Sequence, residues 1–199
     1  MEFEQNKTIA YYDQHASEFA KSTVDVDFKE MQERFLEKIP LKAHILDFGC
    51  GSGRDTRYFM ERGYQVTPVD GSKELCQKAE CYTGVPVRHM LFQELEEQET
   101  YDGIWACASI LHLSGQELLE VMPRMAAALK EKGIVYTSFK YGNFEGMRNG
   151  RYFLDMTEEK WTEMVQKTGA FKLEEYWITS DVRPGRGEER WLNIILRKK

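Results

Sequence analysis

The sequence of 199 residues has no apolar run long enough to cross a membrane, and its first ten residues, MEFEQNKTIA, lack the basic and apolar blocks of a signal peptide. We therefore expect a cytoplasmic protein with no membrane partner. Apolar residues make up 42% and charged residues 30% of the chain, which is typical of a globular protein. A chain of this length can bury a sizeable core, so we expect residues 1–199 to form a single domain.

Cysteine is scarce and widely spaced. Cys50, Cys76, Cys81 and Cys107 include no C-x-x-C pair, and no histidine stands at zinc-finger spacing from them. We therefore expect no metal site. Disulfides are not expected either, because the cytoplasm keeps thiols reduced.

An excess of positive charge is also missing. The formal net charge is −6 at pH 7, which argues against a broad basic face for nucleic acid. Only the stretch 181–199 is locally basic, with six basic residues against three acidic ones. We expect a small-molecule substrate rather than a nucleic-acid partner, and the sequence does not predict the oligomeric state.

Apolar and β-branched runs alternate with longer helical patterns along the chain. The spacing of apolar residues predicts helices over 5–20, 28–38, 54–62, 72–81, 115–130 and 157–168. Strands are predicted over 44–48, 64–70, 85–91, 101–109, 134–139, 171–179 and 190–197. This order predicts an α/β fold with a mostly parallel sheet. Residues 140–156 are the least regular part, and we expect an insertion or active-site loop there.

A glycine-rich loop follows the first predicted strand, in "ILDFGCGSGRDT" (45–56). Gly49 and Gly51 fit the dinucleotide pattern G-x-G-x-x-G, but Arg54 replaces the third glycine, which is displaced to Gly53. No G-K-[ST] follows, which excludes a phosphate-binding P-loop. Asp70, 19 residues after Gly51, ends the second predicted strand, where a carboxylate can accept both hydroxyls of a ribose. The loop therefore favours a nucleoside ligand without a pyrophosphate, and the alternative is a plain turn between strand and helix.

The pair "ILDFGCGSG" and "VTPVDGS" resembles the cofactor half of the class I S-adenosylmethionine-dependent methyltransferases. The resemblance extends from "YYDQHASEFA" through "YDGIWACASILHL" and "LKEKGIVYTSF" to the last predicted strands. It is similar to the small single-domain branch that includes tellurite-resistance-type and ubiquinone-type methyltransferases. The resemblance implies a Rossmann-like sheet of seven strands, the last one antiparallel, with helices on both faces. It also implies S-adenosyl-L-methionine as the cofactor.

The resemblance also assigns cofactor contacts by position. The methionine end would be held by Tyr12, Asp47, Gly49, Cys50, Gly51 and Gly53, and the adenosine by Asp70, Gly71, Ser72, Leu91 and Phe92. Cys107 and Ala108 would line the sulfonium side. Many relatives carry an acidic residue after the third strand to bond the adenine amino group, but "HMLFQEL" stands here. That bond then comes from the backbone, from Gln93 or Glu94, or is absent.

His112 in "ASILHL" is the candidate catalytic residue, because it follows the fourth predicted strand at the ligand-binding edge of the sheet. It would act as a general base; the alternative is a contact with the cofactor or with a nearby carbonyl. Candidate acceptor contacts are Tyr11, His15, Lys140, Arg148, Arg151, Tyr152, Arg183 and Arg186. Clustered guanidinium groups suit an anionic acceptor. The alternatives are aromatic packing for Tyr11 and His15 and plain solvation for the loop arginines.

These observations favour methyl transfer to a small acceptor of anionic or aromatic character. Three other functions stay open at this point. The locally basic tail fits an RNA or protein methyltransferase, and the cofactor loop alone fits a non-catalytic S-adenosylmethionine-binding regulatory module. A nicotinamide oxidoreductase is disfavoured by the displaced glycine.

Overall fold

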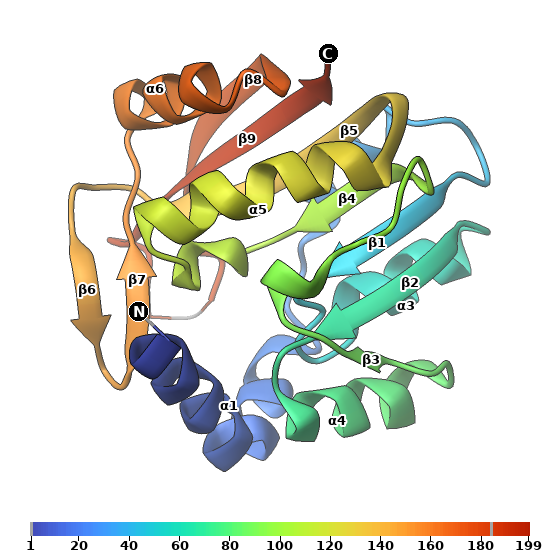
Figure 1. Cartoon of the computed structure of the whole chain (residues 1–199). Coiled ribbons are helices and arrows are strands. Elements are labelled where there is room, and N and C mark those ends of the chain that lie inside the picture. Colours follow the sequence, from blue (N-terminus) through green and yellow to red (C-terminus); the bar gives the residue numbers. More distant parts are fainter. Residues whose placement is uncertain (1, 184) are drawn as a thin grey trace.

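The computed structural model describes residues 2–183 and 185–199, with side chains from residue 7 onward within these ranges. The helices are α1 (Glu2–Thr23), α2 (Lys29–Leu36), α3 (Arg54–Glu61), α4 (Lys73–Thr83), α5 (Gly115–Ala128) and α6 (Glu158–Thr168), with the short 3-10 turns η1 (Phe92–Glu94) and η2 (Ile110–His112). The strands are β1 (His44–Phe48), β2 (Gln65–Asp70), β3 (Arg88–His89), β4 (Tyr101–Ala106), β5 (Leu129–Lys140), β6 (Glu145–Arg148), β7 (Arg151–Leu154), β8 (Phe171–Ser180) and β9 (Arg190–Lys198). Figure 1 shows their arrangement.

Seven strands form one sheet in the order β3-β2-β1-β4-β5-β9-β8. Strands β1 to β5 pair in parallel, whereas β9 runs antiparallel to both of its neighbours, β5 and β8. The prediction of a Rossmann-like sheet with an antiparallel last strand is confirmed. From β1 the chain first adds β2 and β3 on one side of the sheet and then crosses to add β4 and β5 on the other side, so the switch point lies between β1 and β4. Ligands of open α/β sheets bind at such a switch point, beyond the carboxyl ends of the strands.

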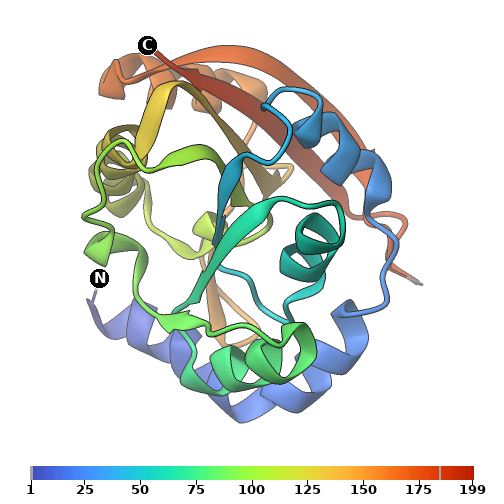
Figure 2. The ribbon, with the colours of Figure 1, turned by 90° about the vertical axis from the view of Figure 1, so that its right-hand side faces the viewer.

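Helices cover both faces of the sheet, as the side view in Figure 2 shows. The central strands are therefore apolar on both sides. Within β1, Ile45 packs in a cluster with Phe35 of α2 and Phe59 of α3. Its neighbours Leu46 and Phe48 belong to a second cluster on the face of α5 and α6.

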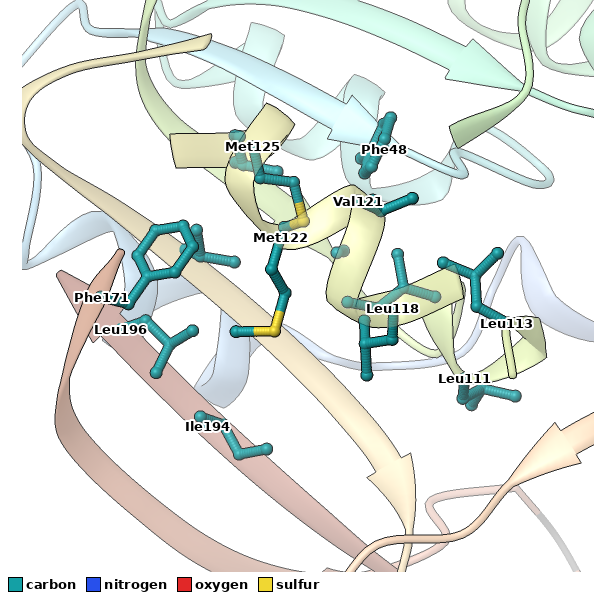
Figure 3. Packing of buried hydrophobic residues seen from close by; sticks show 14 of the residues in the cluster. Phe48, Leu111, Leu113, Leu118, Val121, Met122, Met125, Phe171, Ile194 and Leu196 are labelled. Atoms are coloured by element: carbon teal, nitrogen blue, oxygen red, sulfur yellow. The ribbon is translucent and has the colours of Figure 1, made fainter. Parts of the chain in front are cut away.

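The second cluster is the larger core, and Figure 3 shows part of it. Helix α5 contributes residues at helical spacing, among them Leu118, Val121, Met122 and Met125. They pack together with strand residues, among them Ile194 and Leu196 of β9. This core holds the ends of β4 and β5 in fixed positions.

Side-chain caps start the helices that flank the ligand edge. Ser72 caps α4 by accepting from the Leu75 N–H at 3.1 Å, as the sequence predicts. Ser114 and Glu117 form a reciprocal capping box at the start of α5. Thr157 caps α6 by accepting from the Lys160 N–H. These caps satisfy the free backbone donors of each first turn.

The segment 140–156 differs from the expectation of an irregular loop. It contains the antiparallel hairpin of β6 and β7, turned through Asn149 and Gly150 with φ of 51° and 79°. An Asn-Gly pair with both φ values positive is the favoured two-residue hairpin turn. In Figure 1 the hairpin stands beside α1.

Two other boundaries also differ from the predicted ones. Strand β3 is only two residues long, and Pro86, which cannot donate to a ladder, lies before it. Helix α5 ends at Ala128 because Leu129 is already extended, so β5 begins before Gly133. In the part of the chain that the structure describes, every helix is too short or too polar to span a lipid bilayer.

Candidate active site

A pocket opens beyond the carboxyl ends of β1, β2 and β4, where the segments 49–52, 70–72 and 107–109 form one wall. Residues of α1, of the β6–β7 hairpin and of the β8–β9 turn form the opposite wall, among them Tyr12, Arg151 and Arg183. Segments far apart in the sequence thus meet at the switch point of the sheet.

The glycine loop forms the bottom of this pocket. Gly49 and Gly51 have φ of 90° and 56°, values that side chains rarely adopt. A Cβ on Gly49 would lie 2.4 Å from the Cβ of Ser109. The N–H groups of Gly49 and Cys50 both donate to the Val69 carbonyl at 2.9 Å, which fixes the loop against the end of β2. The sequence requires glycine here for conformation and for space.

Asp47 and Gly53 lie outside the pocket wall, unlike the other loop residues assigned to the cofactor. The buried Asp47 carboxylate accepts from the Thr56 hydroxyl at 2.5 Å, so it links β1 to α3. Burial, and next the charge of Asp55, raise the pKa of Asp47. A Cβ on Gly53 would meet Thr83 of α4 at 2.8 Å, so this glycine allows close helix packing. Direct contact of these two residues with a cofactor has no support from the geometry.

Asp70 presents its carboxylate to the pocket at the end of β2. Its Oδ2 accepts from the Gly51 N–H and its Oδ1 from the Ser72 N–H, both at 2.9 Å. Each oxygen keeps a lone pair, which suits two hydroxyl donors from a ribose. Burial raises the pKa of Asp70, while the two backbone donors act in the opposite direction. The carboxylate is held in one orientation by the glycine loop and the start of α4.

The segment 90–92 covers the same end of the pocket with apolar side chains. Phe92 packs edge-on against Phe48, with ring centroids 4.7 Å apart. The Glu94 carboxylate accepts from the Leu91 N–H at 2.7 Å, and neither Gln93 nor Glu94 lines the pocket. The geometry gives no support to Gln93 or Glu94 as the source of the adenine amino contact, so the backbone source and the absence of this contact stay as predictions.

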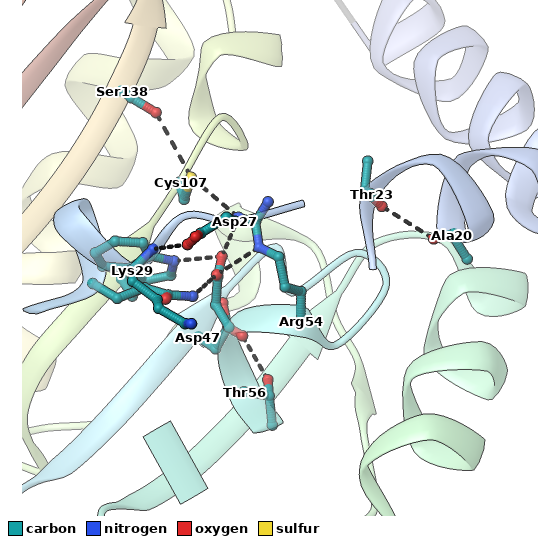
Figure 4. Close-up of polar contacts among 12 residues, drawn as sticks. Ala20, Thr23, Asp27, Lys29, Asp47, Arg54, Thr56, Cys107 and Ser138 are labelled. Carbon is teal, nitrogen blue, oxygen red and sulfur yellow. Dashed lines mark hydrogen bonds and ion pairs between the residues drawn. The ribbon is translucent and has the colours of Figure 1, made fainter. Parts of the chain in front are cut away.

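Arg54 and Asp55 form part of the pocket wall that sequence analysis missed. The Arg54 guanidinium donates to both oxygens of Asp55, at 2.8 Å each. Asp55 also accepts from the Trp105 indole at 2.8 Å and from the Gln32 amide at 2.6 Å. Figure 4 shows this network, in which Arg54 also approaches Cys107. Burial, followed by the Asp55 charge, raises the pKa of Cys107 to about 12, so its thiol is neutral.

His112 lines the pocket and has two hydrogen bonds. Its Nδ1 is 2.6 Å from the Tyr152 carbonyl oxygen, which can only accept, so Nδ1 carries the proton. Its Nε2 therefore accepts from the Tyr12 hydroxyl at 2.8 Å. Burial lowers the pKa of His112 to about 4, and the positive charge of Arg151 acts in the same direction. The imidazole is neutral, and its unprotonated nitrogen, Nε2, already accepts a hydrogen bond.

Arg151, at the start of β7, contacts the same tyrosine from the other side. Its Nη1 donates to the Tyr12 hydroxyl oxygen at 3.3 Å, and its guanidinium lies 4.7 Å from the Tyr11 ring centroid. Burial raises the pKa of Tyr12, although the Arg151 charge opposes this shift. Tyr12 is thus a neutral hydroxyl held between a donor and an acceptor.

The other basic residues of the pocket are paired with carboxylates. Arg183 Nε donates to Asp181 at 2.9 Å, and Lys140 forms an ion pair with Glu189. Arg186 is 3.9 Å from Glu189. The predicted basic cluster is present, but most of its charge is neutralised within the protein.

The remaining acceptor candidates lie behind the pocket wall. Tyr11 stacks on His15 with ring centroids 4.2 Å apart, and neither lines the pocket. Arg148 donates to Asp155 at 2.8 Å on the outer part of the hairpin. Tyr152 contributes its backbone, whose N–H donates to Thr8 and whose carbonyl accepts from His112.

Comparison with known proteins shows which proteins the chain is similar to. Residues 45–133 match the family model of a methyltransferase domain. The chain is 27% identical over 118 residues to malonyl-[acyl-carrier protein] O-methyltransferase of Salmonella typhimurium, covering 57% of this chain and 45% of that protein. It is 31% identical over 126 residues to human N-terminal Xaa-Pro-Lys N-methyltransferase 1, covering 57% and 56%. The chain spans about half the length of the curated relatives it matches.

Solved structures extend the similarity over the whole chain. A 1,6-didemethyltoxoflavin-N1-methyltransferase of Burkholderia thailandensis, solved with S-adenosylhomocysteine, has a TM-score of 0.77 at 22% identity, covering 98% of this chain and 88% of that one. The [4+2]-cyclase SpnF has a TM-score of 0.74 at 15% identity, covering 98% and 96%. At sequence identities of 22% and 15%, the similarity to these two structures is a similarity of fold alone.

Residues 45–133 thus match a methyltransferase domain, and the whole chain has the Rossmann-like fold of S-adenosylmethionine-dependent methyltransferases. S-adenosyl-L-methionine is the cofactor of these methyltransferases, as the resemblance implies. The known relatives act on different acceptors, so the family leaves the acceptor of this chain undetermined.

Proposed function

We propose that this chain acts as a single methyltransferase domain that transfers the methyl group of S-adenosylmethionine to a small molecule. The observation that carries this proposal is one continuous pocket. One half has the glycine loop and Asp70, and the other half has the side chains of Tyr12, Lys140 and Arg183. A donor and a small acceptor would share this space.

The residues of the donor half fit the cofactor. Asp70 would accept the ribose hydroxyls, Gly49 to Gly51 would bring the backbone close to the methionine end, and the segment 90–92 would cover the adenine. When bound, S-adenosylmethionine supplies an electrophilic methyl group on a positively charged sulfur. Cys107 and Ala108 would face that sulfur, and the neutral thiol adds no charge beside it.

The chain's own contribution to the reaction is alignment and exclusion of water. Alignment of two reactants in a near-attack geometry is worth up to about 7–11 kcal/mol in model reactions. Helix α1 and the hairpin cover the pocket, and the Tyr12–His112 hydrogen bond links α1 to the end of β4. The role of His112 as a general base stays a prediction. Its geometry supports the alternative, in which the imidazole bonds a nearby carbonyl and positions the Tyr12 hydroxyl.

A small acceptor is supported by the charge of the acceptor half. Its lysine and two of its arginines are paired with Asp181 or Glu189, so the pocket offers no broad basic face to RNA. The toxoflavin-precursor enzyme of similar fold acts on a small molecule, whereas the human relative is named for protein N-termini. We also propose a cytoplasmic location, which the four unpaired cysteines support.

Two measurements test this proposal. Isothermal titration with S-adenosylhomocysteine should give binding, and absence of binding by the wild-type chain would contradict it. A tritiated-methyl transfer screen should then label a metabolite fraction and leave tRNA and protein fractions unlabelled. Labelling confined to RNA or protein would instead identify a macromolecular acceptor. Binding without transfer to any fraction would identify a non-catalytic module or another chemistry on this fold, such as that of the cyclase SpnF.

A further inference from the structure

The positive charges that line the pocket have carboxylate partners, with one exception. Among the described residues, each lysine or arginine of the pocket wall except Arg151 lies within 4.0 Å of a carboxylate: Arg54 with Asp55, Lys140 and Arg186 with Glu189, and Arg183 with Asp181. Lys140 and Arg186 share one carboxylate. In the described part of the chain, Arg151 is the cation of the pocket wall that has no carboxylate partner within this distance.

The position of this guanidinium is fixed by its surroundings. The Arg151 side chain is half-buried, with its Nε inaccessible and without a hydrogen-bond partner. Its guanidinium lies 4.7 Å from the ring centroid of Tyr11 and 5.2 Å from that of Phe153. The Asn149–Gly150 turn directly before it packs against Tyr11, where a Cβ on Gly150 would come within 2.8 Å. A charge held in this way is not a freely solvated loop arginine.

Charge and geometry indicate which anion suits Arg151. Of the three carboxylates that also line the pocket, Asp55 and Asp181 are paired with Arg54 and Arg183, and Asp70 accepts from backbone N–H groups. A single carboxylate matches the one guanidinium of Arg151 in charge and in planar geometry. The neighbouring Tyr12 hydroxyl already donates to His112, so it offers no second proton to the anion.

We propose that Arg151 is the carboxylate-binding residue of this pocket, a role that rests on the proposed function. The carboxylate has two chemical sources: the amino-acid end of the cofactor, or the acceptor itself. In either case Arg151 sets specificity by charge, and its removal weakens the binding of ligands that carry the carboxylate. Analogues without the carboxylate are unaffected by its removal.

The first experiment tests the cofactor as the source. Isothermal titration compares S-adenosylhomocysteine with its decarboxylated analogue on the wild type and on Arg151→Gln. If the cofactor supplies the carboxylate, the wild type binds the analogue at least tenfold more weakly. Arg151→Gln then binds S-adenosylhomocysteine at least tenfold more weakly and no longer distinguishes the two ligands. Arg151→Lys, which keeps the charge, should recover part of the difference.

The second experiment tests the acceptor as the source. With S-adenosylhomocysteine saturating, titration compares 4-hydroxybenzoate with its neutral amide, 4-hydroxybenzamide. If the acceptor supplies the carboxylate, the wild type prefers 4-hydroxybenzoate at least tenfold, and Arg151→Gln loses that preference while it keeps its affinity for S-adenosylhomocysteine.

Controls separate this proposal from simpler effects. Arg57→Gln removes one positive charge from the exposed surface of α3, outside the pocket wall, and should leave every affinity unchanged. Thermal unfolding without ligand checks that Arg151→Gln is folded. The proposal is overturned if neither wild-type ligand pair differs tenfold, or if Arg151→Gln keeps the discrimination. Failure of the wild type to bind S-adenosylhomocysteine would instead contradict the proposed function itself.

Discussion

Asp70 shows how a single carboxylate can be prepared for a ligand. Two backbone N–H groups orient it, one from the glycine loop and one from the start of α4. Both of these segments also line the pocket, so the carboxylate and the surfaces around a bound nucleoside are fixed together.

We expect Asp70→Asn to weaken S-adenosylhomocysteine binding ten- to hundredfold. Hydrogen bonds to a charged group contribute about 1.5–3 kcal/mol, and the amide keeps only one accepting oxygen. Isothermal titration measures the change. Asp102→Asn is the control, because Asp102 pairs with Lys130 and lies outside the pocket wall. Equal affinities of wild type and Asp70→Asn would remove Asp70 from the ribose site.

His112 gives the protein a pH-dependent stability. Its pKa is about 4 in the fold against an ordinary value of 6.5, so the unfolded chain binds the proton more readily. The contribution of this residue to stability is complete above pH 6.5 and is lost as the pH falls toward 4. The full difference is about 3 kcal/mol.

Urea unfolding of the wild type at pH 7, 5.5 and 4 should show this loss. His112→Gln can still donate to the Tyr152 carbonyl and accept from Tyr12 but does not titrate. Its stability should therefore fall by about 3 kcal/mol less between pH 7 and pH 4. If the free energy of unfolding fell equally with pH in the two proteins, His112 would not be the titrating group.

Residues whose role depends on local sequence were predictable, and those whose role depends on distant partners were not. Asp70 and Ser72 follow from a strand end and a helix start that are visible in the sequence. In the sequence, Arg54 was noted only because it replaces the third glycine of the dinucleotide pattern. Its position in the pocket wall depends on Asp55, which in turn accepts from Trp105 and Gln32, two residues distant in sequence. The pairing of Arg183 with Asp181 was equally invisible, although the two are near in sequence, because the strand ends decide which side chains meet.

At the scale of elements, the glycine loop is shaped by what surrounds it. Gly49 combines a positive φ with a neighbour that leaves no room for a side chain, whereas Gly63 has φ of 82° and no atom within 4 Å of the Cβ position. A substitution at Gly63 therefore tests backbone strain alone, whereas a substitution at Gly49 tests backbone strain together with a steric clash.

We expect Gly63→Ala to cost about 1–2 kcal/mol, which is the penalty for a side chain in the left-handed region. Gly49→Ala should cost about 1–3 kcal/mol more, because its methyl group overlaps Ser109. Urea unfolding measures both variants, and S-adenosylhomocysteine titration should show weaker binding for Gly49→Ala alone. Equal unfolding costs for the two variants would contradict the steric role of Gly49.

The β6–β7 hairpin was the element least visible in the sequence. Its strands have four residues each, which is too short to show a period, and three consecutive residues of β7 are buried. The Asn149–Gly150 pair was the available signal, since this dipeptide favours a two-residue hairpin turn. The alternation of strands and helices elsewhere was clear because each element is long enough to show its period.

At the scale of the whole molecule, α1 is separate from both hydrophobic cores. Among the described residues, neither buried cluster nor the partly buried side chains packed against it include a residue of α1. The helix instead packs along α4 and β7 and contributes Thr8, Ile9, Tyr12, Phe19 and Thr23 to the pocket wall. It contributes more to the ligand site than to the stability of the sheet.

We therefore expect a variant that lacks residues 1–23 to fold and to lose ligand binding. Its far-UV circular dichroism and cooperative unfolding should persist, because the sheet and both cores remain. Its affinity for S-adenosylhomocysteine should fall at least tenfold, because one wall of the pocket is missing. Titration and urea unfolding of the truncated chain check both parts. Loss of cooperative unfolding would show that α1 is required for the fold.

Strand β9 has a consequence for the order in which the chain can assemble. It follows β8 in the sequence but lies between β5 and β8 in the sheet. In a chain that lacks residues 190–198, β8 has no strand to pair with, and β5 presents an open edge. Both edges are then exposed to pairing with other chains. Refolding of a chain that ends before residue 190 should thus give more aggregate, measured by light scattering, than refolding of the full chain.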